Sequence, residues 1–374
     1  MTLTPAELAR YSRHLSLSEF GLAGQEKLKA ARVLVIGAGG LGSPALLYLA
    51  AAGVGQLGIV DFDRVDVSNL QRQVLFDATN VTQGKAEAAR NRLLALNPHL
   101  DIHIHAEELR AANVLDRVRD YDVVLDGTDR FATRYLVNDA CVILGKPLVS
   151  AAIHRFEGQA FTYVPGRGPC YRCLFPEPPA DGVVPNCAEA GVLGVLPGVM
   201  GVIQATEAIK LIAGIGEPLL GRLLTYDALD MRFGEFQFKA RQDCAVCGTQ
   251  PTISEPQDMN VSCASEPALR SISANQLNTV MRADSSRWQL VDVREPYEYA
   301  AGHIDGALSM PLAQLPSTAA ALDTTASVIF ICRSGGRSAQ ACQWAHSQGF
   351  ADVLNLQDGM LAWQQEVDPS MIVA

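Results

Sequence analysis

Three groups of residues have types and spacings that indicate a chemical role, and the first is a set of four cysteines in two C-x-x-C pairs. Cys170 and Cys173 lie in "PCYRC", and Cys244 and Cys247 lie in "DCAVC", about 70 residues further on. Four thiolates at this spacing are typical of a tetrahedral Zn²⁺ site that is structural, because no ligand position stays open. Both pairs stand among Pro, Gly and Asp residues rather than in apolar runs, which argues against four buried free thiols. We therefore predict a structural zinc site.

A glycine turn in "VIGAGGLGSPALLYLAAAGVGQLGIVDFD" (35–63) is the second group. Gly37, Gly39 and Gly42 give the G-x-G-x-x-G spacing, in which the glycines allow a tight turn, close approach of phosphate and close packing of helix on strand. Phosphates would lie at the helix N-terminus, where free N–H groups and the helix dipole favour anions. Asp61 ends the next strand, 19 residues after Gly42, where an acid can bind a ribose hydroxyl. NAD and ATP fit this pattern equally well.

Three residues further along favour a nucleoside triphosphate over a dinucleotide. Arg72 lies in "DFDRVDVSNLQRQVLF" (61–76), Lys85 starts a helical segment, and Asp129 ends "DGTD" (126–129) just past a strand. Arg72 can donate two parallel hydrogen bonds to phosphate oxygens, and Lys85 can attract the same oxygens as a point charge. Asp129 can coordinate Mg²⁺. Either cation alone would be a solvated surface charge. Together, after a glycine turn, the three predict an ATP and Mg²⁺ site.

Cys332 is the third group, in "VIFICRSGGRSAQACQWAHSQGF", preceded by "LVDVREPYEYAAGHIDGALSMPL". It ends a buried strand and opens a loop that runs directly into a helix. The loop N–H groups, the helix dipole, Arg333 and Arg337 would stabilise a negatively charged sulfur, either a thiolate or a persulfide. Cys332 to Arg337 is C-x₄-R, one residue shorter than the C-x₅-R loop of phosphatases, so the cradle suits sulfur rather than phosphate.

The remaining cysteines have weaker signals. Cys187 lies in the Gly/Pro-rich stretch "VPNCAEAG" before an apolar helix, where a reactive thiol and a spectator remain equally open. We expect no chemistry from Cys141, Cys263 and Cys342, which fall in a helix interior, a linker and the helix after the Cys332 loop.

The elements that must position these residues follow an alternating pattern. Strand-like runs ("RVLVIG", "QLGIVD", "DIHIHA", "DVVLDG", "KPLVSA") alternate with helical segments such as 82–96 and 131–145. This alternation predicts an α/β fold with a Rossmann-like, doubly wound and mostly parallel sheet over 1–250. The stretch 251–269 is polar and rich in Pro and Ser, which indicates a linker. Further strands and helices over 270–374 predict a separate small α/β domain.

Composition limits the classes of function. The 374 residues are 48% hydrophobic and 19% charged, which is typical of globular domains. With a net charge of -10 and no Lys/Arg run, we expect no nucleic-acid or membrane partner. The N-terminal 20 residues form an amphipathic helix pattern, and no apolar run reaches about 18 residues. Nine cysteines, four of them in C-x-x-C pairs, suit a reducing compartment, so we expect a cytoplasmic protein.

The stretch "RYSRHLSL…GQEKL…VLVIGAGGLGSPALLYLAAAGVG…DFDRVDVSNLQRQ…K…NP…DGTD" resembles the ubiquitin-activating-type superfamily. The resemblance covers about the first 250 residues and is greatest to its bacterial molybdopterin-synthase and thiamine-pathway adenylyltransferases, with "SNLQRQ" the most specific motif. It implies a Mg²⁺ on Asp129 and ATP on a set of four residues, namely Gly40, Asp61, Arg72 and Lys85. It also implies that Arg13 reaches in from the partner subunit of a homodimer. Arg130 departs from the pattern, because this family usually has Asn there.

The same resemblance agrees with zinc on the four paired cysteines and implies a protein partner. That partner is a small ubiquitin-like sulfur-carrier protein ending in Gly-Gly, whose C-terminal carboxylate becomes an acyl adenylate. Relatives carry a cysteine at the position of Cys187 that is proposed to meet the activated carrier, through a thioester or a link to a persulfide.

Residues 270–374 resemble the rhodanese sulfurtransferases, with Cys332 as the persulfide carrier and "DVREPYEY…GHIDGA" as a second signature. Joined on one chain, the two resemblances predict adenylation of a sulfur carrier followed by formation of its thiocarboxylate, with sulfur from thiosulfate or a cysteine desulfurase. Three alternatives remain at this point. They are a conjugation enzyme that holds the carrier as a Cys187 thioester, an NAD-dependent oxidoreductase with a sulfur-binding appendage, and a non-catalytic docking scaffold.

Overall fold

A computed structural model describes residues 2–178, 191–259, 270–283 and 288–373 of the chain. It divides into two compact units, Met1–Asn260 and Val261–Ala374. Each unit has its own sheet, and each is described here by itself.

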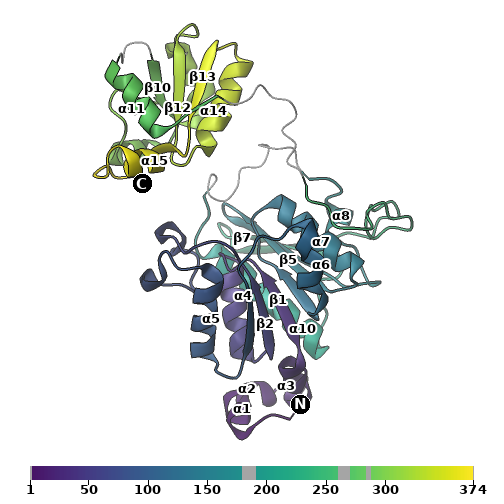
Figure 1. Cartoon of the computed structure of the whole chain (residues 1–374). Helices are drawn as coiled ribbons and strands as arrows, with labels where there is room; N and C mark the ends of the chain where they lie inside the picture. The colour runs from purple at the N-terminus through teal and green to yellow at the C-terminus, as the bar shows by residue number, and fades with distance from the viewer. Residues whose placement is uncertain (1, 179–190, 260–269, 284–287, 374) are drawn as a thin grey trace. The chain divides into compact units, whose positions relative to one another are not determined.

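Unit 1 is built on an eight-stranded sheet with the strand order β3-β2-β1-β4-β5-β6-β7-β8 (Figure 1). Strands from β3 to β5 in this order pair in parallel, whereas the pairs from β5 to β8 are antiparallel. The strands are β1 (Arg32–Ile36), β2 (Gln56–Val60), β3 (Asp101–His105), β4 (Val123–Asp126), β5 (Leu148–His154), β6 (Glu157–Tyr163), β7 (Arg222–Asp227) and β8 (Arg232–Gln237).

Helices cover both faces of the parallel part of this sheet, as the alternating side chains of β1 show. Val33 and Val35 pack into one apolar cluster with α4 and α10, and Leu34 and Ile36 pack into a second cluster with α6 and α7. A strand buried on both faces reads as a continuous apolar run, which is the pattern of "RVLVIG". The helices are α1 (Pro5–Arg10), α2 (Ser12–Leu15), α3 (Gly21–Ala30), α4 (Gly42–Ala52), α5 (Lys85–Leu96), α6 (Ala111–Arg119), α7 (Phe131–Ile143), α8 (Tyr171–Leu174) and α10 (Leu196–Ala213), with 3₁₀ turns η1 (Val67–Asn69) and η2 (Ala78–Asn80).

Unit 2 has a five-stranded sheet with the order β11-β10-β12-β13-β9, and all its strand pairs are parallel. Its strands are β9 (Ser271–Ile272), β10 (Trp288–Asp292), β11 (Leu308–Ser309), β12 (Ser327–Ile331) and β13 (Asp352–Leu356). Its helices are α11 (Ala274–Ala283), α12 (Pro296–Ala301), α13 (Leu315–Thr318), α14 (Gly336–Ser347) and α15 (Gly359–Glu366), with 3₁₀ turns η4 (Leu312–Gln314) and η5 (Ala319–Ala321).

The predicted fold class is confirmed, and the differences are local. The N-terminal amphipathic pattern forms two short helices, α1 and α2, because the chain turns at Tyr11, which is buried. The Tyr11 hydroxyl accepts a hydrogen bond from Asn97, 2.9 Å away, and this contact fixes the turn against the body of unit 1. The proposed linker stays a prediction. Its described part, 251–259, belongs to unit 1 and is held there by bonds such as the one that the Ala111 N–H donates to Asp258 Oδ1, 2.7 Å away.

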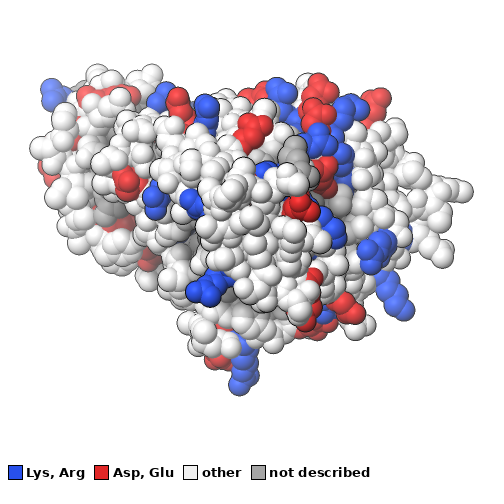
Figure 2. Space-filling view, turned by 90° about the horizontal axis from the view of Figure 1, so that it is seen from below, with Lys and Arg blue, Asp and Glu red and all other residues white. Residues whose placement is uncertain are grey.

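Helix α10 is long and apolar enough to cross a membrane by length and composition alone, but half of it is buried inside the protein. It packs against α3, α4, β5 and β6, so it is a core helix of unit 1. On the face of the molecule in Figure 2, acidic and basic side chains lie interspersed between areas of uncharged surface. On that face the net negative charge is therefore not gathered into one patch.

Candidate nucleotide and sulfur-transfer sites

The glycine turn joins the carboxyl end of β1 to α4, and two of its glycines have no room for a side chain. Gly37 has φ +88°, and a Cβ there would lie 3.0 Å from the Gly127 carbonyl oxygen. A Cβ on Gly42 would lie 1.8 Å from the Gly37 carbonyl oxygen. At Gly39, by contrast, the Gln73 side chain at 3.7 Å is the only group of the described residues within 4 Å of such a Cβ, so among these residues the middle of the turn is open to a ligand. This arrangement fits phosphates held by backbone N–H groups at the start of α4.

Asp61 follows β2 and is tied to the glycine turn. Its carboxylate accepts the Ala38 N–H at 2.8 Å and the Asp63 N–H at 2.9 Å. Burial raises the pKa of Asp61 above its ordinary value, and the positive charge of Lys85 opposes this rise. Since β2 is the parallel neighbour of β1, the acid lies beside the turn, as binding of a ribose hydroxyl requires.

Arg72 and Lys85 both lie close to this region. A Cβ on Gly40 would be 3.8 Å from Cδ of Arg72, whose guanidinium donates to the Ser68 carbonyl oxygen at 3.1 Å. Lys85 is the first residue of α5, and its ammonium lies 3.0 Å from Asp63 Oδ2, with only 7% of the lysine side chain exposed. Sequence reasoning gave Asp63 no role. Its signal was its place as the second acid of "DFD", two residues after Asp61.

The two acids of "DGTD" have different environments. Asp126, at the end of β4, is fully buried, and its carboxylate accepts from Thr128, Ser150 and Arg134 at distances between 2.6 and 3.2 Å. Asp129 is exposed, and nothing in the described parts of the chain forms a hydrogen bond or ion pair with its carboxylate. Asp126 therefore holds the loop, whereas Asp129 is left free for a cation, and a carboxylate is a donor that Mg²⁺ accepts. The role of Asp126 was not anticipated, because both acids look alike in the sequence.

Arg13 does not reach this site within one chain. It is an exposed residue of α2, two residues after Tyr11, and a Cβ on Gly53 would lie 2.4 Å from the Tyr11 ring. Gly53 caps the C-terminal end of α4, and the glycine turn is at the other end of that helix, about 16 Å away at 1.5 Å per residue. Cys187, the other predicted reactive group of this unit, lies outside the described residues.

The four paired cysteines come together into one cluster. All four Sγ atoms lie within 4.8 Å of one another, with 3.7 Å between Cys170 and Cys244 and 3.3 Å between Cys173 and Cys247. Four sulfurs around one Zn²⁺ at about 2.3 Å require S···S separations of about 3.8 Å, so the cluster fits the ion. The Arg241 N–H lies 3.4 Å from Cys173 Sγ, a donor suited to a negatively charged thiolate. Within the knuckle, Arg172 forms two bonds of 2.7 and 2.8 Å with the Asp139 carboxylate on α7.

Cys141 and Cys342 were expected to be spectators, and their surroundings agree. Both are fully buried, and burial raises the pKa of the Cys141 thiol far above its ordinary value and that of Cys342 to about 12. Each is therefore a neutral thiol at ordinary pH. Cys263 lies outside the described residues.

In unit 2, the Cys332 sulfur lies at the end of β12 inside the loop that leads to α14. The Gly335 N–H donates to Sγ at 3.1 Å, and the Ser338 hydroxyl lies 3.2 Å from Sγ and 3.1 Å from the Gly335 carbonyl oxygen. Gly335 has φ +91°, a conformation that lets the loop curl around the sulfur. The loop backbone is braced from the start of α15, since the Met360 N–H donates to the Cys332 carbonyl oxygen at 2.8 Å.

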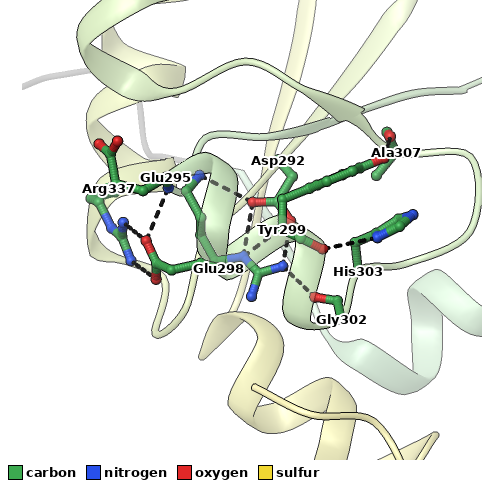
Figure 3. Close-up of polar contacts among 9 residues, drawn as sticks. Asp292, Glu295, Glu298, Tyr299, Gly302, His303, Ala307 and Arg337 are labelled. Carbon is green, nitrogen blue, oxygen red and sulfur yellow. Dashed lines mark hydrogen bonds and ion pairs between the residues drawn. The ribbon is translucent and has the colours of Figure 1, made fainter. Parts of the chain in front are cut away.

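Arg337, the second residue of α14, binds a carboxylate rather than standing free beside the sulfur. Its two terminal nitrogens lie 2.6 and 2.8 Å from the oxygens of Glu298, as the paired dashed lines in Figure 3 show. Burial alone would raise the pKa of Glu298, but the Arg337 pairing outweighs it and the pKa is lowered. A second, fully buried pair, Arg294 with Asp292, fixes the start of α12 through a bond of 2.7 Å. Arg333 forms no side-chain hydrogen bond or ion pair within the described residues, so it remains a free cation at the loop.

Fold and site geometry together define a nucleotide-binding α/β unit with a four-cysteine knuckle, followed by a unit with a sulfurtransferase-type cysteine loop. Residues 11–246 match the model of the ThiF family, and residues 273–366 match the Rhodanese-like domain. The chain belongs to the ThiF family and carries a C-terminal rhodanese domain.

Relatives are found in bacteria and animals, and two of them match over nearly the whole chain. The chain is 47% identical to the probable adenylyltransferase/sulfurtransferase MoeZ of Mycobacterium tuberculosis, over 99% of this chain and 96% of that protein. It is 40% identical to the adenylyltransferase and sulfurtransferase MOCS3 of Drosophila ananassae, over 98% and 86% of the two chains. The sulfur carrier protein adenylyltransferase of Thermus thermophilus is 52% identical over 70% of this chain and 99% of its own. Among solved structures, Escherichia coli MccB with ATP superposes with a TM-score of 0.57 at 26% identity, covering 64% of this chain and 74% of MccB.

Proposed function

We propose that the protein uses ATP to adenylate the C-terminal glycine of a ubiquitin-like sulfur-carrier protein and then replaces the adenylate with sulfur carried on Cys332. The observation that supports this most strongly is that one chain carries two sites. The first is an open glycine turn flanked by Asp61, Arg72 and Lys85. The second is Cys332, whose sulfur accepts hydrogen bonds from the residues that follow it. The carrier belongs to the molybdenum-cofactor, thiamine or a related sulfur pathway. The relatives' names speak for adenylyl and sulfur transfer rather than hydride transfer.

In the adenylation step, a carboxylate oxygen of the carrier attacks the α-phosphorus of ATP. The new P–O bond forms as the bond to the β-phosphate oxygen breaks, and pyrophosphate leaves with the electron pair. Arg72 and Lys85 offset the charge that develops on pyrophosphate, and Asp61 holds the ribose. Lys85 has to exchange its contact with Asp63 for the phosphates, and the exposed Asp63 carboxylate can be solvated when it does.

Two metal ions belong to this proposal. Asp129 would hold Mg²⁺, which supplies further positive charge to the phosphates when bound. Cys170, Cys173, Cys244 and Cys247 would hold Zn²⁺, which is structural because four thiolates complete its coordination.

Sulfur transfer starts with loading of Cys332. The thiolate attacks the outer sulfur of thiosulfate, releasing sulfite, or the outer sulfur of a persulfide on a cysteine desulfurase, releasing that enzyme's thiolate. The terminal sulfur on Cys332 then attacks the acyl carbon of the adenylate, and the C–O bond to AMP breaks. A second thiol attacks Sγ of Cys332, loses its proton and forms a disulfide with it, so that the carrier leaves as a thiocarboxylate.

We further propose that the active form is a homodimer in which Arg13 of each chain serves the other chain's nucleotide site. This would explain why Arg13 lies at the far end of α4 from the glycine turn of its own chain. A cavity lined by apolar side chains of α4 and α10 lies beside α2, with Tyr48 57% exposed, and suits burial against a second copy. We assign the reaction to the cytoplasm, because free thiols such as Cys332 persist in a reducing compartment.

The test is intact-mass spectrometry of a carrier ending in Gly-Gly after incubation with the full chain, Mg-ATP and thiosulfate. We expect one carboxylate oxygen of the carrier to be replaced by sulfur. With Cys332→Ala, the carrier should keep an AMP adduct but gain no sulfur, whereas Asp129→Ala should abolish both products.

Three outcomes would count against the proposal or a part of it. A carrier that stays unmodified while the wild-type chain consumes no ATP would favour a docking scaffold. Sulfur transfer that survives Cys332→Ala would remove the assigned role of the rhodanese loop. An Asp129→Ala chain that still forms the AMP adduct would remove the magnesium assignment alone.

A further inference from the structure

The short helix α8 belongs to the four-cysteine knuckle and lies against α7 (Figure 1), and Tyr171 makes the connection between them. Tyr171 stands between the paired residues Cys170 and Cys173. Its N–H donates to Asn138 Oδ1 of α7 at 2.8 Å. The guanidinium of Arg134, also on α7, lies over its ring, with the central carbon 5.8 Å from the ring centre. Both side chains are buried, so the ring and the guanidinium are in contact within the core of unit 1.

Arg134 also holds the loop that ends in Asp129. Its Nη2 donates to the Thr128 carbonyl oxygen at 2.8 Å, and its Nε lies 3.2 Å from Asp126 Oδ2. The Thr128 N–H and hydroxyl in turn donate to Asp126 Oδ1, at 3.0 and 2.6 Å. Thr128 is thus held from two sides directly before Asp129. One guanidinium therefore contacts the knuckle through Tyr171 and the "DGTD" loop through Thr128.

The Tyr171 ring limits the positions that the Arg134 side chain can take. An arginine has many rotamers, and a planar guanidinium packed on a buried aromatic ring is restricted to few of them. Without the ring, the guanidinium would tilt and keep its attraction to Asp126, which depends less on orientation than the hydrogen bond to Thr128 does. The bond nearest to Asp129 would then weaken. Because Mg²⁺ demands near-ideal octahedral geometry, a carboxylate on a loosened loop binds it less well.

We propose that Tyr171 is a positioning residue that links the four-cysteine knuckle to magnesium binding at Asp129. It acts through Arg134 and Thr128 rather than by contact with the nucleotide. This inference rests on the proposed binding of Mg²⁺ by Asp129. With Zn²⁺ bound, the cysteines would hold α8, and with it Tyr171, in one place. The knuckle then supports nucleotide binding in addition to stabilising the fold.

The experiment measures binding of labelled ATP to the full chain by equilibrium dialysis while Mg²⁺ is titrated. Tyr171→Met removes the aromatic ring but fills much of its volume. We expect this variant to raise the Mg²⁺ concentration at half-maximal binding by about five- to tenfold. Its ATP binding without Mg²⁺ and its zinc content per chain should stay as in wild type. Tyr171→Phe, which keeps the ring, should restore the wild-type magnesium dependence.

Tyr163→Met is the matched control, because Tyr163 and Tyr171 belong to the same apolar cluster and are both 4% exposed. Within the described parts of the chain, Tyr163 forms no hydrogen bond, ion pair or ring contact with Arg134. The control should destabilise unit 1 as Tyr171→Met does, but should not change the magnesium dependence. Arg134→Lys makes the same test without altering the knuckle, and it should also raise the Mg²⁺ concentration at half-maximal binding. The double variant should be no weaker than Arg134→Lys alone.

Three results would contradict these expectations. An unchanged magnesium dependence in Tyr171→Met, or an equal shift in Tyr163→Met, overturns the inference. Additive effects of Tyr171→Met and Arg134→Lys overturn it as well, because Tyr171 would then not act through Arg134. A wild-type chain whose ATP binding does not respond to Mg²⁺ would instead refute the magnesium assignment in the proposed function, and the role of Tyr171 with it.

Discussion

The nucleotide site of unit 1 and the cysteine loop of unit 2 are assembled in opposite ways. The first collects side chains from the ends of β1, β2 and β4 and the start of α5, and several of its charges remain exposed or weakly paired. The second is one continuous stretch that runs from Cys332 into the start of α14, and the Cys332 sulfur already faces its donors. A site that waits for a highly charged ligand needs free charges, whereas a site that holds one sulfur atom can satisfy its groups internally.

The acids of the two sites show the same contrast. Burial raises the pKa of Asp61, since the groups around it do not fully compensate for loss of solvent. Glu298 is also buried, but its pKa is lowered because Arg337 binds both of its oxygens. The charged form of Asp61 is therefore disfavoured as long as no ligand is bound at the nucleotide site. The ion pair of Glu298 with Arg337, by contrast, is complete without a ligand.

The largest effect should come from breaking the four-cysteine cluster of unit 1, because this change should destabilise unit 1 and leave unit 2 unaffected. We expect Cys244→Ser to lose zinc and to lower the unfolding free energy of unit 1 by about 5 kcal/mol or more. Circular dichroism reports the whole chain, and tryptophan fluorescence reports unit 2, because all three tryptophans, Trp288, Trp344 and Trp363, lie there. Only the first signal should shift.

Cys141→Ala is the matched control for this prediction. Cys141 is a buried thiol of the same unit outside the cluster, so its loss should cost about 1 kcal/mol and leave the zinc content unchanged. If Cys244→Ser retains one zinc per chain by metal analysis, the four-cysteine assignment is wrong.

Much of this architecture could be predicted from the sequence, because its signals are local. The strand β1 is an apolar run buried on both faces, and the glycine turn follows it within six residues, Gly37 to Gly42. Cys332 and its donors likewise come from one short stretch. The close agreement at these places reflects physics that acts over a few residues, namely side-chain periodicity and positive φ.

Other features could not be predicted, because they depend on contacts between distant segments. Of the groups that distinguish the two acids of "DGTD", Thr128 is local, but Arg134 and Ser150 come from α7 and β5. The partner of Arg337 is Glu298, 39 residues away, and neither residue alone indicates the pair. The ion pair of Arg130 with Glu108 joins the segments that follow β4 and β3, so it is visible only once the strand order is known.

Removing one donor from the Cys332 sulfur should have an intermediate effect and would test whether the cysteine loop is complete in itself. We expect Ser338→Ala to slow sulfur transfer from thiosulfate to cyanide by about tenfold. This factor corresponds to the free energy that one hydrogen bond to a charged group contributes. Adenylation should not change. Ser327→Ala, which removes a hydroxyl that donates to Asp352 in the same unit, should leave both rates unaltered. An unchanged rate in Ser338→Ala would mean that the Gly335 N–H suffices.

The smallest effect should come from Glu298→Gln, which turns the internally paired site of unit 2 into one with an unpaired cation. Because the pKa of Glu298 is lowered in the folded state, its charge stabilises unit 2 above the ordinary pKa of about 4.3. That stabilisation is lost as the pH falls through the folded-state pKa. At pH 7 we expect the variant to unfold about 1 kcal/mol more easily, measured by tryptophan fluorescence in urea. The difference from wild type should shrink as the pH falls below the ordinary pKa of about 4.3 and toward the lowered folded-state pKa of Glu298, where the wild-type carboxylate takes up its proton. A difference that stays constant from pH 7 to pH 3 would show that Arg337 does not depend on the charge of Glu298, and the contrast between the two sites would then lose its electrostatic basis.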